Sequence, residues 1–378
     1  MEEEFIVLNI NGGNAPYLRS LDLAFAMNRK RVNEGLFPFG IIVPLIYGNK
    51  QKEIIKDEFK DIDPEELSHV YFDEIYGGLL EKILFDGSDY SAYLRNLVAH
   101  QETIQSLIRD HFSVSITVKN IVGGLVCVKS DQLVLELSRN PVVNIGLPRR
   151  IYTSIVFFSE IITKTYLDNP LKLDLELLHS LRKVAERIEE NYDLYILFEP
   201  STFIGEEQEF KITVGGKEVH LSPPLVQPLR LNGYSHNKPF IYASVSGIPH
   251  LTPLLQNASI PQWDILNSKE TSPRILLHKN ARYHIARAGF GSIIKSVETL
   301  TPLIVPNYES SDDLEIYHNI KQLKKLNLAV ILEGHLTNDV LKSAHLCLTD
   351  VVYLKKHLLG KYGTLDGASY IAEKFNLV

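Results

Sequence analysis

The chain has 378 residues, more than one hydrophobic core usually supports, so its length predicts two domains. A formal charge of −7 excludes the net basic surface of a general nucleic-acid binder. The start is acidic where a secretory signal needs Lys or Arg, and no run approaches the roughly 20 apolar residues that span a bilayer. We therefore expect a cytoplasmic protein.

Strands and helices alternate at the start of the chain. Buried strands are predicted over 5–10 and 40–46, each followed by a helical pattern. The order strand, loop, helix, strand is typical of parallel α/β architecture. The stretch 60–113 is predicted to be mostly helical, and its clearest helix covers 92–109.

The alternation resumes after residue 120 and ends at a proline-rich stretch. We expect strands over 121–128, 141–146 and 194–198, and helices over 131–139, 151–167 and 173–190. The segment 219–239 then carries four Pro, which cannot belong to a helix and suit a crossing between domains. This stretch is the predicted domain boundary.

The same alternation restarts after the boundary. Strands are predicted over 240–246, 274–278, 283–287, 303–307 and 329–332, with helices opening at 251, after 292, at 312 and at 337. Two such α/β halves place ligands in a cleft, where the carboxyl ends of both sets of strands face each other.

A glycine-rich turn, "AGFGS" at 288–292, lies between a predicted strand and a predicted helix. Helix N-termini carry unpaired N–H groups and a partial positive charge, and glycine lets an anion approach the backbone. Ser292 could cap the helix or donate to a phosphate oxygen. The turn is therefore either a diphosphate site or a tight turn that packs the helix on the sheet.

The wider segment 287–332 resembles the C-terminal half of GT-B glycosyltransferases. The resemblance rests on the turn followed by Thr301-Pro302, Pro306, Asp312-Asp313, His318-Asn319 and "LNLA" at 326–329. The related family includes the enzyme that adds N-acetylglucosamine to lipid-linked peptidoglycan precursor, and UDP-glycosyltransferases that act on small molecules. Weaker similarity covers "NGGNAPYLRSLDLAFAM", "VHLSPPLVQP", "SVSGIP" and "GTLDGASYIAEKF".

The resemblance implies an α/β fold with two Rossmann-like domains facing across a cleft and a C-terminal helix that crosses back. We expect an acceptor domain at 1–225, a linker at 226–238, a nucleotide-sugar domain at 239–360 and the crossing helix at 361–378. The implied donor-binding residues are Ser244, Ser246, Gly247, Arg287, Gly289, Phe290, Gly291, Ser292, Lys295, Asp312, Asp313 and Asn319.

The chain departs from the family pattern at two positions. Many relatives carry a His after the first glycine loop as general base, and here that position is Asn14, whose amide cannot take a proton. His100 and Asp131 are the alternative bases, although His100 fits a helix surface better and Asp131 fits a helix N-cap better. Relatives also carry a ribose-binding Glu where this chain has Lys295, which can only donate.

On the acceptor side we expect Gly12, Gly13, Arg149 and Arg150. Two Arg in a loop that opens into the cleft could hold an anionic acceptor, and the apolar stretch behind them could lie on a membrane surface. The simpler interpretation is that this stretch is core and the Arg pair begins a helix. Cys127 and Cys347 lie in apolar stretches without a metal-site spacing.

The sequence therefore predicts a metal-independent hexosyl- or N-acetylhexosaminyltransferase without a cofactor. Its substrate would be a nucleoside-diphosphate sugar, with UDP foremost, and its acceptor a small molecule, a glycan or a lipid-linked compound. Asp61-Ile62-Asp63 resembles the Asp-x-Asp motif of metal-dependent transferases, but the following Pro64 favours a helix cap. Two alternatives remain: a non-catalytic, degenerate member that acts as a partner or sensor, and a sugar-nucleotide 2-epimerase.

Overall fold

The computed structural model describes residues 4–8, 14–85, 90–113, 115–121, 123–138, 150–154, 157–190, 192–199, 213–214, 216–225, 236–244, 255, 260, 262–269, 271–309, 312–375 and 377. The chain divides into two compact units. Unit 1 comprises Met1–Leu225 together with Gly367–Val378, and unit 2 comprises Val226–Asp366. Unit 2 is therefore inserted, in chain order, into unit 1.

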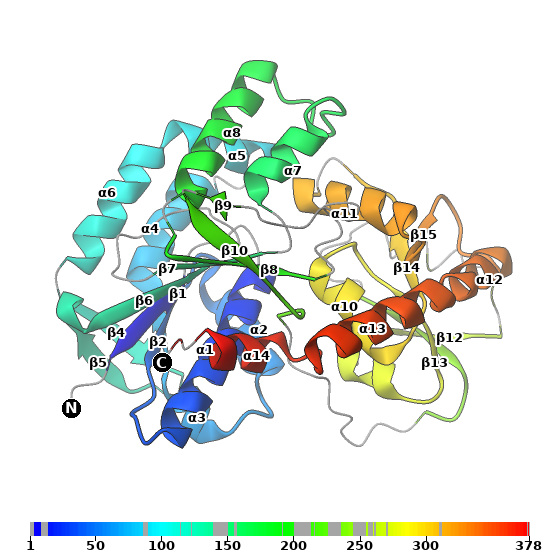
Figure 1. Cartoon of the computed structure of the whole chain (residues 1–378), viewed down its shortest axis with the longest axis horizontal. Helices are drawn as coiled ribbons and strands as arrows, with labels where there is room; N and C mark the ends of the chain where they lie inside the picture. The colour runs from blue at the N-terminus through cyan, green and yellow to red at the C-terminus, as the bar shows by residue number, and fades with distance from the viewer. Residues whose placement is uncertain are drawn as a thin grey trace. The chain divides into compact units, whose positions relative to one another are not determined.

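Unit 1 is built on a ten-stranded sheet in the order β5-β4-β3-β2-β1-β6-β7-β8-β10-β9 (Figure 1). The seven strands from β3 to β10 run parallel, while β4, β5 and β9 are antiparallel at the two edges. The strands are β1 (Phe5–Leu8), β2 (Gly40–Pro44), β3 (Val70–Asp73), β4 (Ile116–Asn120), β5 (Leu125–Val128), β6 (Leu133–Ser138), β7 (Arg150–Ser154), β8 (Leu194–Phe198), β9 (Thr213–Val214) and β10 (Lys217–Ser222).

Helices cover both faces of this sheet, as fully buried parallel strands require. Figure 1 shows α1 beside α14 on one side, and α5, α6 and α8 on the other. The buried faces of α1 and α14 pack together, with Ile371 and Ala372 of α14 at most 1% exposed. The helices are α1 (Asn14–Asn33), α2 (Gly48–Glu58), α3 (Pro64–Ser68), α4 (Glu74–Leu84), α5 (Tyr90–Ala99), α6 (Gln101–Phe112), α7 (Phe158–Thr165), α8 (Leu175–Glu189) and α14 (Gly367–Lys374).

Unit 2 is built on an all-parallel five-stranded sheet in the order β12-β11-β13-β14-β15. Its strands are four or five residues long, and β11, β14 and β15 are entirely apolar. They are β11 (Phe240–Ala243), β12 (Asp264–Asn267), β13 (Ala281–Ile285), β14 (Leu303–Pro306) and β15 (Ala329–Leu332). The helices are α10 (Phe290–Thr299), α11 (Leu314–Lys325), α12 (Asn338–Leu346) and α13 (Leu348–Tyr362), with a 3₁₀ turn at Pro273–Leu277.

Several predicted elements of unit 1 are wrong. The helix expected over 131–139 is a 3₁₀ turn, Ser130–Gln132, followed by strand β6, whose sequence "LVLELS" alternates Leu with other residues at the strand period. The helix expected over 151–167 is strand β7 followed by α7. Strand β3 was missed within 60–113, and the helix expected over 92–109 breaks at His100 into α5 and α6.

Smaller corrections concern single features. The segment 274–278 is part of the 3₁₀ turn rather than a strand, because Ser272 caps its N-terminus and Pro273 occupies the first position. Of the two Cys in apolar stretches, Cys127 is exposed on edge strand β5 and Cys347 is buried. Asp63 caps α3 by accepting from the Glu65 N–H, so the predicted cap is confirmed. The strand expected over 141–146 and the helix opening at 251 lie outside the described residues.

Candidate ligand-binding site

The glycine-rich turn of unit 2 connects the carboxyl end of β13 to the first turn of α10. Gly289 is the N-cap of α10, with φ −75° and ψ 144°, and no side chain caps the helix. The N–H groups of Ser292 and Ile293 both donate to the Gly289 carbonyl, at 3.0 and 3.2 Å. This end of α10 carries the partial positive charge of a helix N-terminus, so it is electropositive.

Neither glycine is needed for the shape of the backbone, because neither has a positive φ. A Cβ on Gly291 would meet no atom within 4 Å, and a Cβ on Gly289 would touch only the Ile316 side chain at 4.0 Å. The glycines therefore leave open space over the first turn of α10. Such space is what an anion requires to reach backbone N–H groups.

Arg287 begins the turn and is held by two acidic side chains. Its Nε lies 2.7 Å from Asp312 Oδ1, and its Nη2 lies 3.8 Å from Asp313 Oδ2. Asp312 also accepts from the Glu309 N–H, and Asp313 caps α11 through the Ile316 N–H. The guanidinium is thus fixed at the turn, and its charge is largely balanced by the two carboxylates.

Asn319 holds the turn in place through a hydrogen bond from α11. It is fully buried on α11, and its Nδ2 donates to the Ala288 carbonyl at 2.8 Å. Its Oδ1 is buried and accepts no hydrogen bond from the described residues. Asn319 was predicted to bind donor, but its contacts place it behind the turn as a support.

A buried histidine that the sequence analysis missed lies next to the turn. His284 of β13 is 1% exposed, its Nε2 lies 3.1 Å from Ser244 Oγ, and its Nδ1 lies 3.0 Å from Ser296 Oγ of α10. Burial, and secondarily the charge of Lys295, lowers the pKa of His284 to about 3. The imidazole is therefore neutral at any physiological pH.

Three other predicted donor-binding residues of unit 2 lie on α10. Phe290 is 1% exposed, so its ring packs in the core and only its backbone belongs to the turn. Ser292 is not the cap, because that position is Gly289, and it lies in the first turn of α10. Lys295 lies one turn further along, half-buried, near enough to His284 for its charge to act there. Ser246 and Gly247 lie outside the described residues.

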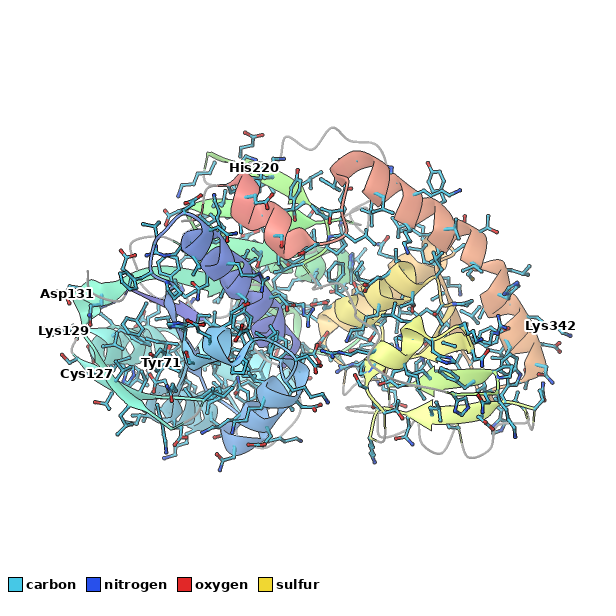
Figure 2. The ribbon with its side chains drawn as sticks, turned by 90° about the horizontal axis from the view of Figure 1, so that it is seen from below. Tyr71, Cys127, Lys129, Asp131, His220 and Lys342 are labelled. Atoms are coloured by element: carbon cyan, nitrogen blue, oxygen red, sulfur yellow. The ribbon has the colours of Figure 1, made fainter. Side chains whose placement is uncertain are left out.

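The predicted residues of unit 1 do not form one group. Asn14 begins α1, after the carboxyl end of β1. Asp131 instead precedes β6, and Arg150 opens β7, so both lie at the amino ends of parallel strands, opposite the edge where ligands bind. Figure 2 shows the labels of Asp131, Lys129 and Cys127 close together on one side of unit 1. His100 is exposed at the start of α6. Gly12, Gly13 and Arg149 lie outside the described residues.

Unit 1 holds two titratable groups that the sequence analysis did not single out. His111 Nε2 lies 2.6 Å from Asp73 Oδ2, and Asp73 ends β3 and caps α4. Glu189 of α8 is buried and accepts from the backbone N–H and hydroxyl of Ser159 in the first turn of α7. Burial raises the pKa of Glu189 to about 7. Both pairs join segments far apart in sequence, which no local pattern reveals.

Two absences concern the described part of the chain. It contains no group of three or more His, Cys, Asp or Glu side chains that could hold a metal ion. Within the same residues, no helix is long and apolar enough to cross a membrane.

Two units with parallel sheets, a glycine turn in the second and a last helix that packs on the first define the GT-B fold of glycosyltransferases. No family model matches the sequence, and no curated protein matches it. Among solved structures, the chain is similar to a UDP-glucosyltransferase from Polygonum tinctorium capable of glucosylating indoxyl, with 11% identity and a TM-score of 0.57 over 99% of this chain and 97% of that one.

Two further solved structures have the same fold. Phytolacca americana UGT2, complexed with UDP-2fluoro-glucose and pterostilbene, gives a TM-score of 0.58 at 13% identity over 99% of this chain and 100% of that one. Arabidopsis thaliana UGT89C1, complexed with UDP-L-rhamnose, gives 0.54 at 12% identity over 100% and 98%. The predicted fold class is therefore confirmed.

Proposed function

We propose that the protein is a metal-independent glycosyltransferase. It would move a sugar from a nucleoside-diphosphate sugar, with UDP as the nucleotide, to a small-molecule, glycan or lipid-linked acceptor. The observation that carries this proposal is the turn Arg287–Ser292, which leaves open space over the N-terminus of α10 at the carboxyl end of β13. The shared fold supports it, because structures with that fold were solved with UDP or UDP-sugars.

In this reaction the turn would stabilise the leaving group. When the bond between the sugar and the diphosphate breaks, negative charge accumulates on the departing diphosphate. The Gly291 N–H and the dipole of α10 would face that charge, and the guanidinium of Arg287 lies at the same turn. These groups are fixed before the ligand arrives, so little reorganisation is needed.

A non-catalytic binding function is the second candidate, and Lys295 favours it. The family pattern implies a ribose-binding carboxylate there, whereas this chain places the positive charge of Lys295 on α10, one turn after Ser292. A helix N-terminus with a Lys on the same helix attracts a diphosphate without requiring a sugar. Under this proposal the protein binds a nucleoside diphosphate but does not release one from a sugar nucleotide.

One experiment separates the two candidates. UDP, GDP and their common sugars are titrated against the whole chain, and the melting temperature is followed. The sugar nucleotide that raises it is then incubated with a panel of acceptors in EDTA, and released nucleoside diphosphate is measured. Acceptor-dependent release in EDTA is expected for the transferase. Stabilisation without release supports the binding protein, and no stabilisation by any nucleotide refutes both.

A further inference from the structure

The group formed by Ser244, His284 and Ser296 connects β11 and β13 to α10, the helix whose N-terminus forms the proposed diphosphate site. Ser244 follows β11 at its carboxyl end, and its N–H donates to the Ile285 carbonyl of the adjacent β13 at 2.8 Å. Ser296 lies on α10, six residues after Phe290, and is 2% exposed. His284 bonds to both hydroxyls, so it links the first strand of the sheet to the helix that opens the site.

The proton count of this group permits only two arrangements. A neutral imidazole has one N–H, so one of its nitrogens donates and the other accepts. In the first arrangement Nδ1–H donates to Ser296 Oγ, and Nε2 accepts the hydroxyl hydrogen of Ser244. In the second, Nε2–H donates to Ser244 Oγ, and Nδ1 accepts the hydroxyl hydrogen of Ser296.

The two arrangements present opposite faces of Ser244 to a ligand. In the first, the only hydrogen of Ser244 Oγ points back at His284, and lone pairs alone face outward. In the second, Ser244 Oγ accepts from His284 and its hydrogen is available to the ligand. Phosphate oxygens only accept, so lone pairs repel them, whereas a hydroxyl donor binds them.

We propose that His284 is a positioning residue that sets Ser244 as a hydrogen-bond donor to the bound diphosphate, with the proton on Nε2. This inference rests on the proposed function, because it takes the anion to lie at the α10 N-terminus. Both arrangements hold the same number of protons, so the imidazole is neutral in each. The burial of His284 keeps a third, doubly protonated form out of the exchange.

The direct test reads the tautomer in the unmodified chain. Protein labelled with ¹⁵N at histidine is recorded with long-range ¹H–¹⁵N correlation, free and saturated with UDP. The His284 signals are assigned by their loss in His284→Gln. Saturated protein is expected to carry the proton on Nε2, and a proton on Nδ1 in that complex overturns the inference. If UDP does not bind at all, the proposed function fails instead.

A double-mutant cycle on UDP affinity gives a second test. Ser244→Ala and His284→Phe are each expected to weaken UDP binding about tenfold or more, the loss of one charge-assisted bond. Because His284 acts through Ser244, the double variant should bind no more weakly than either single variant. Losses that multiply overturn the inference.

Two controls separate positioning from packing. The side-chain amide of His284→Gln can still donate to Ser244, so this variant should keep UDP affinity within about threefold. Ser343→Ala, at an exposed position on α12, should change nothing. The melting temperature without nucleotide is measured for every variant. If His284→Phe does not fold, the tautomer measurement decides alone.

Discussion

Gly291→Val tests whether an anion approaches α10 at the turn. The Cβ at this position would meet no atom within 4 Å, so the side chain enters open space rather than the core. Val and Gly differ by less than about 1 kcal/mol in helix propensity, so we expect unfolding free energy to change by less than that amount. Any large effect must therefore fall on the ligand.

The expected loss of affinity follows from the bonds that the new methyl groups block. One charge-assisted hydrogen bond contributes about 1.5–3 kcal/mol, so losing one weakens UDP binding at least about tenfold. UDP at 100 times its Kd stabilises the parent by about 2.7 kcal/mol. At the same UDP concentration a tenfold weaker variant gains only about 1.4 kcal/mol, so its melting shift is roughly halved.

Gly360→Val is the matched control. Gly360 is an exposed helical residue of α13 in the same unit, and its Cβ would also meet nothing within 4 Å. Calorimetric titration and melting curves with UDP should separate the two variants. If both retain the parent's UDP affinity, the diphosphate does not lie over this turn.

Three further predictions concern charge and support. Lys295→Glu should weaken UDP binding by about 1.5–3 kcal/mol at low salt. The loss should be smaller at high salt, because screening weakens the contact of Lys295 in the parent. Tighter UDP binding by the variant in calorimetry would instead indicate restored ribose recognition. Glu189 has a pKa raised from 4.5 to about 7, so the folded state favours its protonated form and its contribution to stability is lost as pH rises through that range. Glu189→Gln cannot ionise and should therefore gain stability relative to the parent between pH 5 and 8, by on the order of 3 kcal/mol in urea unfolding; a pH-independent difference would show that the carboxyl titrates normally. Asn319→Leu should lower the free energy of unfolding by about 1 kcal/mol in the same assay, since the lost bond to the Ala288 carbonyl is partly offset by removal of the buried Oδ1, which accepts no hydrogen bond from the described residues. It should also weaken UDP binding, because that bond holds the turn. Unchanged stability and unchanged affinity would together show that the bond does not hold the turn.

The fold was predictable where local pattern and tertiary environment agree. Strands such as β8 and β14 are continuous apolar runs, and helix α8 begins with an Asp174 cap and shows helical periodicity, so each has one interpretation. The segments that failed are ambiguous at short range. "RIYTS" and "LVLELS" suit a strand or a buried helix turn, and only pairing with β8 and β1 decides between them.

The candidate site was predictable only in its backbone. A glycine turn before a helix is a local pattern, and the structure places it at the end of β13. Side-chain roles depend on partners that are distant in sequence. Asn319 bonds to Ala288, 31 residues earlier, and Ser244 lies 40 residues before His284. The local sequence around Asn319 or Ser244 therefore does not predict these contacts. The tertiary arrangement decides which residue contacts ligand and which supports the turn.

The insertion of unit 2 into unit 1 sets the order in which the protein can be completed during synthesis. Residues Val226–Asp366 are contiguous, so unit 2 can fold as soon as they have left the ribosome. Unit 1 begins first but must wait for Gly367–Val378, since α14 covers α1 and the Gly367 N–H donates to the Pro224 carbonyl. Gly367 lies so close to Pro223 and Pro224 that a Cβ would sit 2.2 Å from a carbonyl oxygen. The half of the protein that is translated first is therefore the half that finishes last, and until then α1 exposes its apolar face to chaperones and proteases.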